Sequence, residues 1–379
     1  MEFMPLTRPF IGEEEEREVI DTLRSGWLAT GPKTERFERE FAAYLGRKHA
    51  LGTNSCTAAL HLGLLALGIG AGDEVITTPM TFVATANSIV YTGARPVFVD
   101  VEPDTLNIDP RRIADAITER TKAILLVHLY GHPCEMDEIM DIATRFGLKV
   151  IGDCAHAIEA EYKGRKVGSL GHVDCFSFYT SKNLTTGNGG MLVTDDIEVA
   201  TLAQCLRDHG MSPGAWARYR TGEFRHYEMT RLGFKCIMWD VQAALGLQQL
   251  RRLEKRHHRR LEIARWYEAL LQPLNAHLEI LRPRSYVKHS YHIYAIKIKG
   301  VDRDRVAHIM EEKGIGVGVH YRPVHLEPFY RQTYGHCHGE FPVAEDAAAG
   351  LLSLPFWPEM TEEDVHRVVE TLKDAVLAS

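Results

Sequence analysis

The sequence predicts an α/β fold, with a mainly parallel central sheet sandwiched by helices and a smaller C-terminal α/β domain. Three observations support this prediction. Runs rich in Val and Ile alternate with segments of helical periodicity from residue 34 to residue 207. Polar or glycine-rich residues follow several of these runs, as in parallel sheets that bind ligands beyond the carboxyl ends of their strands. A chain of 379 residues also exceeds one usual core, so we expect domains at residues 1–250 and 251–379.

The elements of the first domain can be assigned in order. A helix at residues 13–24 ends at Ser25-Gly26 and leads into a turn-rich loop, SGWLATGPKT, at residues 25–34. Further helices are expected at 35–45, 57–67, 82–91, 111–118, 136–146 and 199–207. Strands are expected at 49–52, 74–78, 96–101, 123–129, 150–153, 175–179 and 191–194. Residues 209–239 are expected to be irregular, with several Gly and one Pro.

A long helix at residues 241–271 is expected to bridge to the second domain. Its segment RRLEKRHHRR is strongly basic, which is compatible with a nucleic-acid contact or with a solvated helix face. Interleaved Glu254 and Glu262 favour the solvated face. Beyond it, strands are expected at 278–281, 292–298 and 317–320, and helices at 303–313, 344–350 and 362–377.

Composition excludes several classes of protein. The net charge of −7 argues against nucleic acid as the main partner, and no apolar run reaches the roughly 18 residues of a membrane span. Residues 1–10 lack the pattern of a signal peptide. Seven cysteines without a C-x-x-C pair favour a reducing cytoplasm. Nineteen histidines show no metal-ligand spacing, so we expect no metal.

The chemistry is expected at the ends of two buried strands. Asp153 ends an apolar run, where an unpaired carboxylate is costly and calls for a cationic partner. A protonated pyridine nitrogen is such a partner; a helix cap or an arginine is the structural alternative. Lys182 follows a second apolar run inside a glycine-rich turn. Most lysines are solvated, but one held against a cationic ring has the lowered pKa that a Schiff-base amine needs.

Other residues fit the same pocket, each with an ordinary structural alternative. The segment NSCTAAL at 54–60 places small polar residues at a helix start, which suits a phosphate group or a plain helix cap. His156 follows Asp153 closely, although a core histidine is the commoner case. Ser177 can add a hydroxyl to a phosphate, and Phe82 can cover a ring face or belong to the core.

The order of several motifs resembles one family closely. NSCTAALHL, GDEVITTPMTFVATANSI, ARPVFVDV, TKAILLVHLYG, GDCAHA and FSFYTSKNLTTGNGGMLVT are similar to segments of DegT/DnrJ/StrS-type aminotransferases, in particular the ArnB-like members. The resemblance runs from Arg8 to Leu377. It implies a fold-type I enzyme that depends on pyridoxal 5′-phosphate (PLP), acts on nucleotide-linked keto sugars and forms a homodimer with shared active sites.

The resemblance also implies roles for single residues. Lys182 matches the Schiff-base lysine, Asp153 the acid that pairs with the pyridine nitrogen, and His156 the residue near the ring hydroxyl. The remaining matches are Phe82 as the stacking aromatic, and Cys56, Thr57 and Ser177 as the phosphate cup. The substrate side is implied to comprise Trp27 and Thr30 of the SGWLATGP loop, and His320, Tyr321 and His325 of HYRPVHL.

Two departures from the family pattern concern the substrate and the neighbouring subunit. GFKCIMWD at 233–240 has Ile237 where a polar side chain is usual for reaching the partner's phosphate, which leaves Lys235 as a substitute. Asn188 stands where Glu is common.

The resemblance implies an amino transfer from L-glutamate to a nucleotide-linked keto sugar, with Lys182 moving the proton. A UDP-4-keto-6-deoxy sugar or 4-keto-pentose is the expected acceptor, and a dTDP-sugar, a keto-inositol and amination at C3 remain alternatives. A PLP-dependent sugar dehydratase is a rival, although such relatives carry histidine in place of Lys182. A non-catalytic relative of the same fold is the other rival, and the intact Lys182, Asp153 and His156 argue against it.

Overall fold

The central layer is a seven-stranded sheet. The structure, a computed structural model, describes residues 2–211 and 228–379. Four neighbouring strand pairs are parallel, and β9 alone runs antiparallel to both of its neighbours. The strands lie in the order β1 (His49–Thr53), β9 (Gly190–Thr194), β8 (Val173–Ser177), β5 (Lys149–Asp153), β4 (Thr121–Val127), β2 (Glu74–Thr77) and β3 (Arg95–Phe98). The predicted mainly parallel α/β sheet is confirmed.

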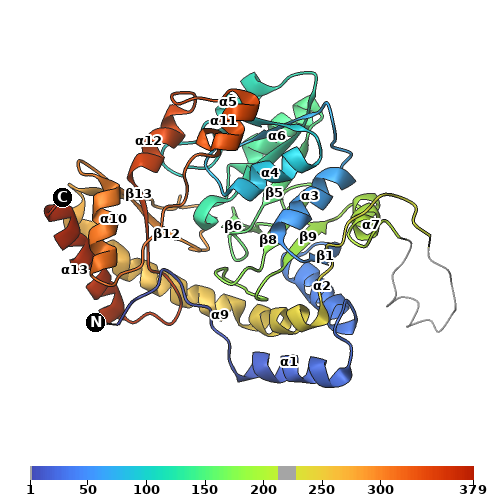
Figure 1. Ribbon diagram of the computed structural model, residues 1–379, viewed down its shortest axis with the longest axis horizontal. Coiled ribbons are helices and arrows are strands. Elements are labelled where there is room, and N and C mark those ends of the chain that lie inside the picture. The colour runs from blue at the N-terminus through green and yellow to red at the C-terminus, as the bar shows by residue number, and fades with distance from the viewer. Residues whose placement is uncertain (1, 212–227) are drawn as a thin grey trace.

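Helices cover both faces of this sheet (Figure 1). Neighbouring strand residues are buried on opposite faces: Val150 and Val193 lie in one core, Ile151 and Leu192 in the other. The helices of this part are α1 (Glu13–Ser25), α2 (Pro32–Leu45), α3 (Cys56–Ala66), α4 (Val83–Tyr91), α5 (Pro110–Ile113), α6 (Met136–Phe146) and α7 (Ile197–Leu206). Helices α2 and α6 pack in the first core, and α3 and α7 in the second. Burial on both faces explains why the strands read as continuous apolar runs.

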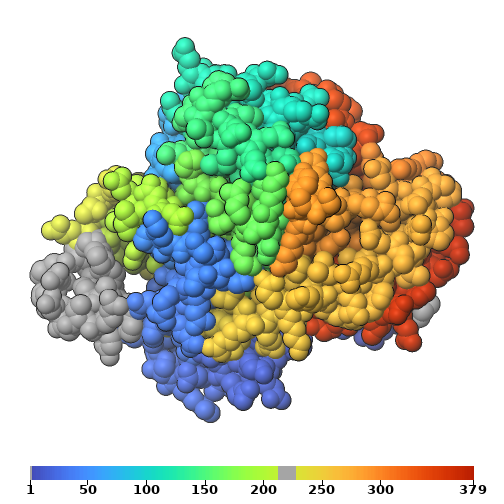
Figure 2. Space-filling model, turned by 180° about the vertical axis from the view of Figure 1, so that it is seen from behind, coloured from blue at the N-terminus to red at the C-terminus, as the bar shows by residue number. Residues whose placement is uncertain are grey.

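Helix α9 (Asp240–Leu271) joins this part of the chain to the C-terminal part. Leu247 and Leu253 pack against the central sheet, whereas Ile263 and Tyr267 belong to a separate C-terminal core. The yellow and orange surface of α9 runs along the lower part of the back face, above the blue N-terminal helices (Figure 2). No helix among the described residues is long and apolar enough to cross a bilayer.

The C-terminal part has an antiparallel sheet of its own. Its strands are β10 (Leu278–Ile280), β12 (Tyr294–Ile298) and β13 (Leu351–Leu354), and its helices are α10 (Arg303–Glu312), α11 (Pro328–Tyr334), α12 (Pro342–Gly350) and α13 (Glu362–Leu377). Met4 packs in the same core and bonds Gly314 and Gly316 through its backbone, so the N-terminal segment lies beside α13 (Figure 1). The division at residues 1–250 and 251–379 stays a prediction, and its boundary falls inside α9.

Some predicted elements differ from those observed. Residues 317–320 do not form the predicted strand, because Gly318 makes only an isolated bridge, to Ser353. Helix α11 and strand β13 were not expected, and neither was the small sheet of β6 (Glu161–Tyr162), β7 (Arg165–Lys166) and β11 (Val287–Lys288). Of the stretch 209–239, expected to be irregular, residues 212–227 lie outside the described part.

The basic segment of α9 is neutralised locally. Arg252 contacts Glu15, Arg256 contacts Glu359 and Arg259 contacts Glu262. The segment is solvated only in part, because His257 and Arg260 are buried and Arg252, Arg256 and Arg259 are half-buried against neighbouring elements.

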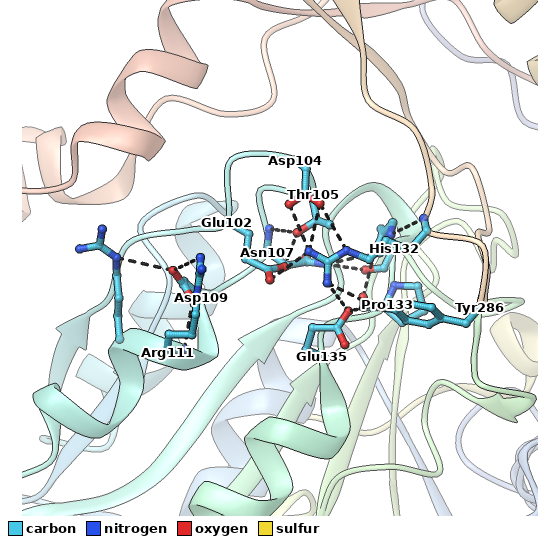
Figure 3. Close-up of polar contacts among 12 residues, drawn as sticks. Glu102, Asp104, Thr105, Asn107, Asp109, Arg111, His132, Pro133, Glu135 and Tyr286 are labelled. Carbon is cyan, nitrogen blue, oxygen red and sulfur yellow. Dashed lines mark hydrogen bonds and ion pairs between the residues drawn. The ribbon is translucent and has the colours of Figure 1, made fainter.

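Arg284 ties the C-terminal part to the central part through the carboxylates of Glu102, Asp104 and Glu135, which Figure 3 shows grouped near Tyr286. Its guanidinium contacts Glu102 and Asp104, each at 3.0 Å, and also Glu135. The Tyr286 hydroxyl donates to Glu135 Oε1 at 2.5 Å. Burial raises the pKa of Glu102, and the Arg284 charge opposes that rise. The Arg284 guanidinium therefore offsets the repulsion among carboxylates that lie close together.

We expect Arg284→Ala to lower the free energy of unfolding by about 2 kcal/mol at pH 8, because the buried Glu102 and Glu135 lose their half-buried cation. The folded-state pKa of Glu102 is already raised, so its ionisation costs stability as the pH rises. The deficit should therefore shrink between pH 8 and pH 5. Urea denaturation at both pH values measures it. Arg282→Ala, which removes an exposed pair with Glu268, is the control and should change stability by less than about 0.5 kcal/mol. Equal losses of stability in the two variants would contradict a stabilising role of Arg284 among these carboxylates.

Candidate active site

Asp153 lies at the carboxyl end of β5, where the parallel sheet opens toward a pocket. Its carboxylate accepts hydrogen bonds from Thr85 Oγ1 at 2.7 Å and from the Ala155 N–H at 3.1 Å. The Cys56 Sγ lies 3.8 Å from Asp153 Oδ1. Burial raises the pKa of Asp153, whereas these donors and the Lys182 charge act to lower it. Asp153 is therefore a buried acid that is held in one orientation.

Lys182 lies in the turn after β8, close enough to Asp153 for the charge of each to act on the pKa of the other. Burial lowers the pKa of Lys182 to about 8, and the nearby Asp153 charge opposes the shift. The structure thus brings together the two residues that the sequence singled out. An amine with this pKa is uncharged in roughly a tenth of molecules at pH 7, which makes it a usable nucleophile and base.

Three uncharged histidines surround the amine. Burial lowers the pKa of His156 and His292 well below the usual value, and that of His320 to about 4, with the Lys182 charge adding to each shift. His292 Nε2 lies 3.3 Å from Lys182 Nζ. The rings of His156 and His292 are 4.5 Å apart. The pocket therefore holds imidazoles that act as hydrogen-bond partners rather than as charges.

His156 is fixed through both ring nitrogens. Its Nδ1 accepts the Tyr130 N–H at 3.2 Å, so Nε2 carries the proton and donates to the Tyr321 hydroxyl at 3.1 Å. Tyr321 in turn lies 6.0 Å from the ring of Phe82, which is 58% exposed. His156, Tyr321 and Phe82 thus lie next to one another. Their contacts with a cofactor or a substrate stay predictions.

The start of helix α3 supplies a place for an anion. Ser55 caps the helix by accepting the Ala58 N–H at 3.2 Å, and the N–H groups of Cys56 and Thr57 have no partner within the helix. Gly190 passes so close that a Cβ there would lie 2.5–2.6 Å from backbone atoms of Ser55 and Cys56. This position therefore requires glycine.

A small cavity adjoins Lys182 on the C-terminal side. Its lining comes from three distant parts of the chain: Leu6 and Thr7, Ser181 and Lys182, and a C-terminal group of His292, Ile293, His320, Tyr321, Leu354 and Phe356. The amine therefore faces a space that is closed partly by the N-terminal segment.

The predicted substrate loop is anchored by an acid that the sequence analysis did not assign. Asp240 accepts the N–H groups of Gly31 at 2.8 Å and Thr34 at 2.9 Å, and thereby caps α2. Thr30 donates to the Met238 carbonyl at 2.5 Å, and Trp27 Nε1 donates to the Thr30 carbonyl at 3.0 Å. Trp27 and Thr30 thus belong to an ordered loop, and their substrate contacts stay a prediction.

Two other predicted residues lie elsewhere. His325 is fully buried and its Nε2 bonds Glu345 Oε1 at 3.0 Å, so the structure contradicts the predicted direct contact with substrate. Lys235 is exposed and pairs with Asp208 at 2.9 Å. Its predicted contact with a neighbouring subunit is not tested by one chain. Asn188 accepts the Gly189 N–H through its own side chain.

The structure adds residues that the sequence did not assign to the site. Thr85 orients Asp153, Tyr130 orients His156, and His292 contacts Lys182. Thr85 lies in the first turn of α4, three positions after Phe82, a signal that could have been followed. His292 comes 110 positions after Lys182 and lies two residues before β12, so nothing local marks it.

Among the described residues one group has the spacing of a metal site: His128, Cys154 and Asp174, all buried. His128 Nδ1 accepts the Cys134 N–H at 3.0 Å, so Nε2 carries the proton and has no lone pair for a metal. Asp174 is already paired with Arg47 at 2.8 Å. This cluster is therefore not suited to a metal ion.

The residues present fit PLP. They offer an amine of lowered pKa, a buried carboxylate across the pocket and a free helix start with the Ser177 hydroxyl nearby on β8. A mainly parallel α/β sheet with these groups at its carboxyl edge defines the class of PLP-dependent enzymes with the aminotransferase fold.

Comparison with known proteins specifies the family. The model of the DegT/DnrJ/EryC1/StrS aminotransferase family matches residues 9–373. The spore coat polysaccharide biosynthesis protein SpsC of Bacillus subtilis is 46% identical over 99% of this chain and 97% of its own length. The PLP form of the putative sugar aminotransferase Spr1654 from Streptococcus pneumoniae is 32% identical, with a TM-score of 0.92 over 99% of both chains. Helicobacter pylori PseC, an aminotransferase of pseudoaminic acid biosynthesis, is 30% identical, with a TM-score of 0.93 over 100% of both chains.

The chain therefore belongs to the DegT/DnrJ/EryC1/StrS aminotransferase family, and it is an enzyme of the aminotransferase class.

We expect Lys182 in the cofactor-free protein to react with an amine reagent according to an apparent pKa of about 8. Below that pH the reactive neutral form should fall about tenfold per unit. Asp153→Asn should lower the pKa further, because the Asp153 charge favours the ammonium. Competitive acetylation at several pH values, with the peptide of Lys182 quantified by mass spectrometry, measures both. Exposed lysines provide the internal reference, and coincidence of Lys182 with them would contradict the pocket environment.

Proposed function

We propose that this aminotransferase transfers the amino group of L-glutamate to a keto sugar linked to a nucleotide, with PLP held on Lys182. The observation that supports the proposal is an amine of lowered pKa that lies close enough to the buried Asp153 for the two charges to act on each other. The relatives support the sugar acceptor, because their names place them in polysaccharide or pseudoaminic acid biosynthesis or call them sugar aminotransferases.

The proposal assigns each end of the cofactor to residues of this chain. Lys182 would bind its aldehyde carbon, and Asp153 would keep its ring nitrogen protonated. Cys56, Thr57 and Ser177 would hold the phosphate at the start of α3. His156 and Phe82 would lie at the ring. When bound, PLP supplies an electron-accepting ring that stabilises negative charge on the substrate carbon.

The chain's own part in the reaction is to hold and move a proton. Released as a neutral amine, Lys182 Nζ takes the proton from the α-carbon of the amino donor. The pocket suits this step because burial keeps a usable fraction of the amine uncharged. The Asp153 carboxylate, fixed by Thr85 and the Ala155 N–H, remains the group that faces positive charge throughout.

For the acceptor we propose a UDP-4-keto-6-deoxy sugar or a UDP-4-keto-pentose. We further propose a cytoplasmic homodimer whose active sites are shared between protomers. The free state of all seven cysteines supports a reducing compartment. The exposed aromatic side chains of Phe82, Tyr179 and Trp239 support a partner surface beside the site.

We expect Lys182→Ala to lower transfer by roughly 10³-fold or more and to leave the cofactor unlinked. Lys182→Arg should behave similarly, because it keeps the charge but loses the nucleophile. Borohydride reduction followed by mass spectrometry of the residue 182 peptide tests the linkage. Exposed Lys48→Ala is the control for general effects. Transfer near the native rate in Lys182→Ala would reject the assignment.

The substrate proposal predicts that glutamate and a UDP-4-keto sugar together give a new sugar amine at C4 and 2-oxoglutarate. A panel of UDP- and dTDP-linked 4-keto and 3-keto sugars and a keto-inositol, with the amine position read by NMR, tests it. Amination at C3, or of the inositol alone, would replace the proposed acceptor.

A further inference from the structure

The Lys182 amine is the last member of a buried chain of hydrogen bonds. Asn183 Nδ2 donates to both carboxylate oxygens of Glu159, at 3.1 and 2.9 Å. Asn183 Oδ1 lies 3.1 Å from His292 Nδ1, and His292 Nε2 lies 3.3 Å from Lys182 Nζ. Glu159 is fully buried, and Asn183 and His292 are each 8% exposed. The family comparison does not assign any of these three residues.

The chemistry of the groups fixes the direction of every bond in this chain. A carboxylate accepts, so the amide NH₂ of Asn183 must face Glu159. The same NH₂ donates to the Ser290 carbonyl at 3.2 Å, which fixes the amide a second time. The amide oxygen can then only accept, so His292 Nδ1 must carry the proton. His292 Nε2 is left bare and faces the lysine.

The imidazole is held uncharged by its surroundings. Burial lowers the pKa of His292, and the positive charges of Lys182 and Arg260 and the neighbouring rings of His156 and His320 lower it further. Burial also raises the pKa of Glu159 to about 7, but either form keeps a carboxyl oxygen that accepts from Asn183. The direction of the chain therefore does not depend on the charge of Glu159.

We propose that Glu159 and Asn183 lock His292 in the Nδ1–H tautomer, so that its bare Nε2 accepts a hydrogen bond from Lys182 and aims the lone pair of the amine into the pocket. The opposite tautomer would point an N–H at the amine and occupy that lone pair. His292 thus orients the reacting nitrogen, and Asn183 and Glu159 are positioning residues. The consequence for transfer rests on the proposed role of Lys182, whereas the hydrogen-bond chain can be tested without it.

The test measures the reactivity of Lys182 in the cofactor-free protein by competitive acetylation across pH. His292→Phe removes the acceptor that stabilises the ammonium, and Asn183→Leu removes the group that keeps this acceptor bare. The apparent pKa of Lys182 should therefore fall in both variants, by about one unit or more in His292→Phe, the worth of a hydrogen bond to a charged group. His292→Phe retains a ring against His156, which limits the packing change. If one variant does not fold, the other carries the test alone.

Two further variants separate the chain from general effects. Glu159→Gln keeps an oxygen that can accept from Asn183, so its shift should be smaller than that of Asn183→Leu. His257→Phe removes another fully buried histidine, whose Nε2 bonds the His289 carbonyl, and should leave the pKa of Lys182 in place. In ¹⁵N-histidine NMR, the signal absent from His292→Phe should show the Nδ1–H tautomer in the native protein and in Glu159→Gln.

The proposal is overturned if the pKa of Lys182 stays within about 0.3 units in both Asn183→Leu and His292→Phe, or if His292 is found as the Nε2–H tautomer. A shift in Glu159→Gln as large as that in Asn183→Leu would also overturn the tautomer lock, in favour of a charge effect. Because these readouts use cofactor-free protein, their failure is distinct from native-like transfer by Lys182→Ala.

Discussion

The active site depends on keeping an acid and an amine buried opposite each other at one edge of a sheet. Either group alone would be costly to remove from water, and each is stabilised by the charge of the other. Neutral donors also fix Asp153. The parallel order of β4, β5 and β8 brings the turns that carry them to the same edge. Helices pack on both faces of the sheet, and Gly190 lets β9 pass close to the start of α3. Both features hold this edge of the sheet in place.

The sequence was informative where function coincides with local pattern. Asp153 and Lys182 each end or follow a buried apolar run, and a charged residue at such a point is unusual enough to be noticed. Ser55 to Thr57 combine small polar side chains with a helix start. The alternation of helices and strands likewise determined the fold class, because a buried parallel sheet leaves continuous Val- and Ile-rich runs.

The sequence was uninformative where a contact joins distant segments. His292 lies just before β12 and Asn183 follows the lysine, and only tertiary packing brings their side chains into contact. His325 was wrongly expected at the substrate because its motif lies near Tyr321, yet the buried Glu345 binds its ring. The strand expected at residues 317–320 was wrong since alternation of side chains does not supply a pairing partner, and β13 was missed because four residues carry too little periodicity.

Leu6 and Thr7 line the cavity beside Lys182, although they precede the first helix and belong to neither face of the sheet. The N-terminal segment therefore lines part of this cavity and also packs in the C-terminal core. A form of the protein that begins at α1 would keep every strand of the central sheet together with Asp153 and Lys182. Its cavity beside Lys182 would lack the part of the lining that Leu6 and Thr7 supply. The choice of cloning boundary for this chain therefore decides whether the cavity beside Lys182 keeps its N-terminal wall.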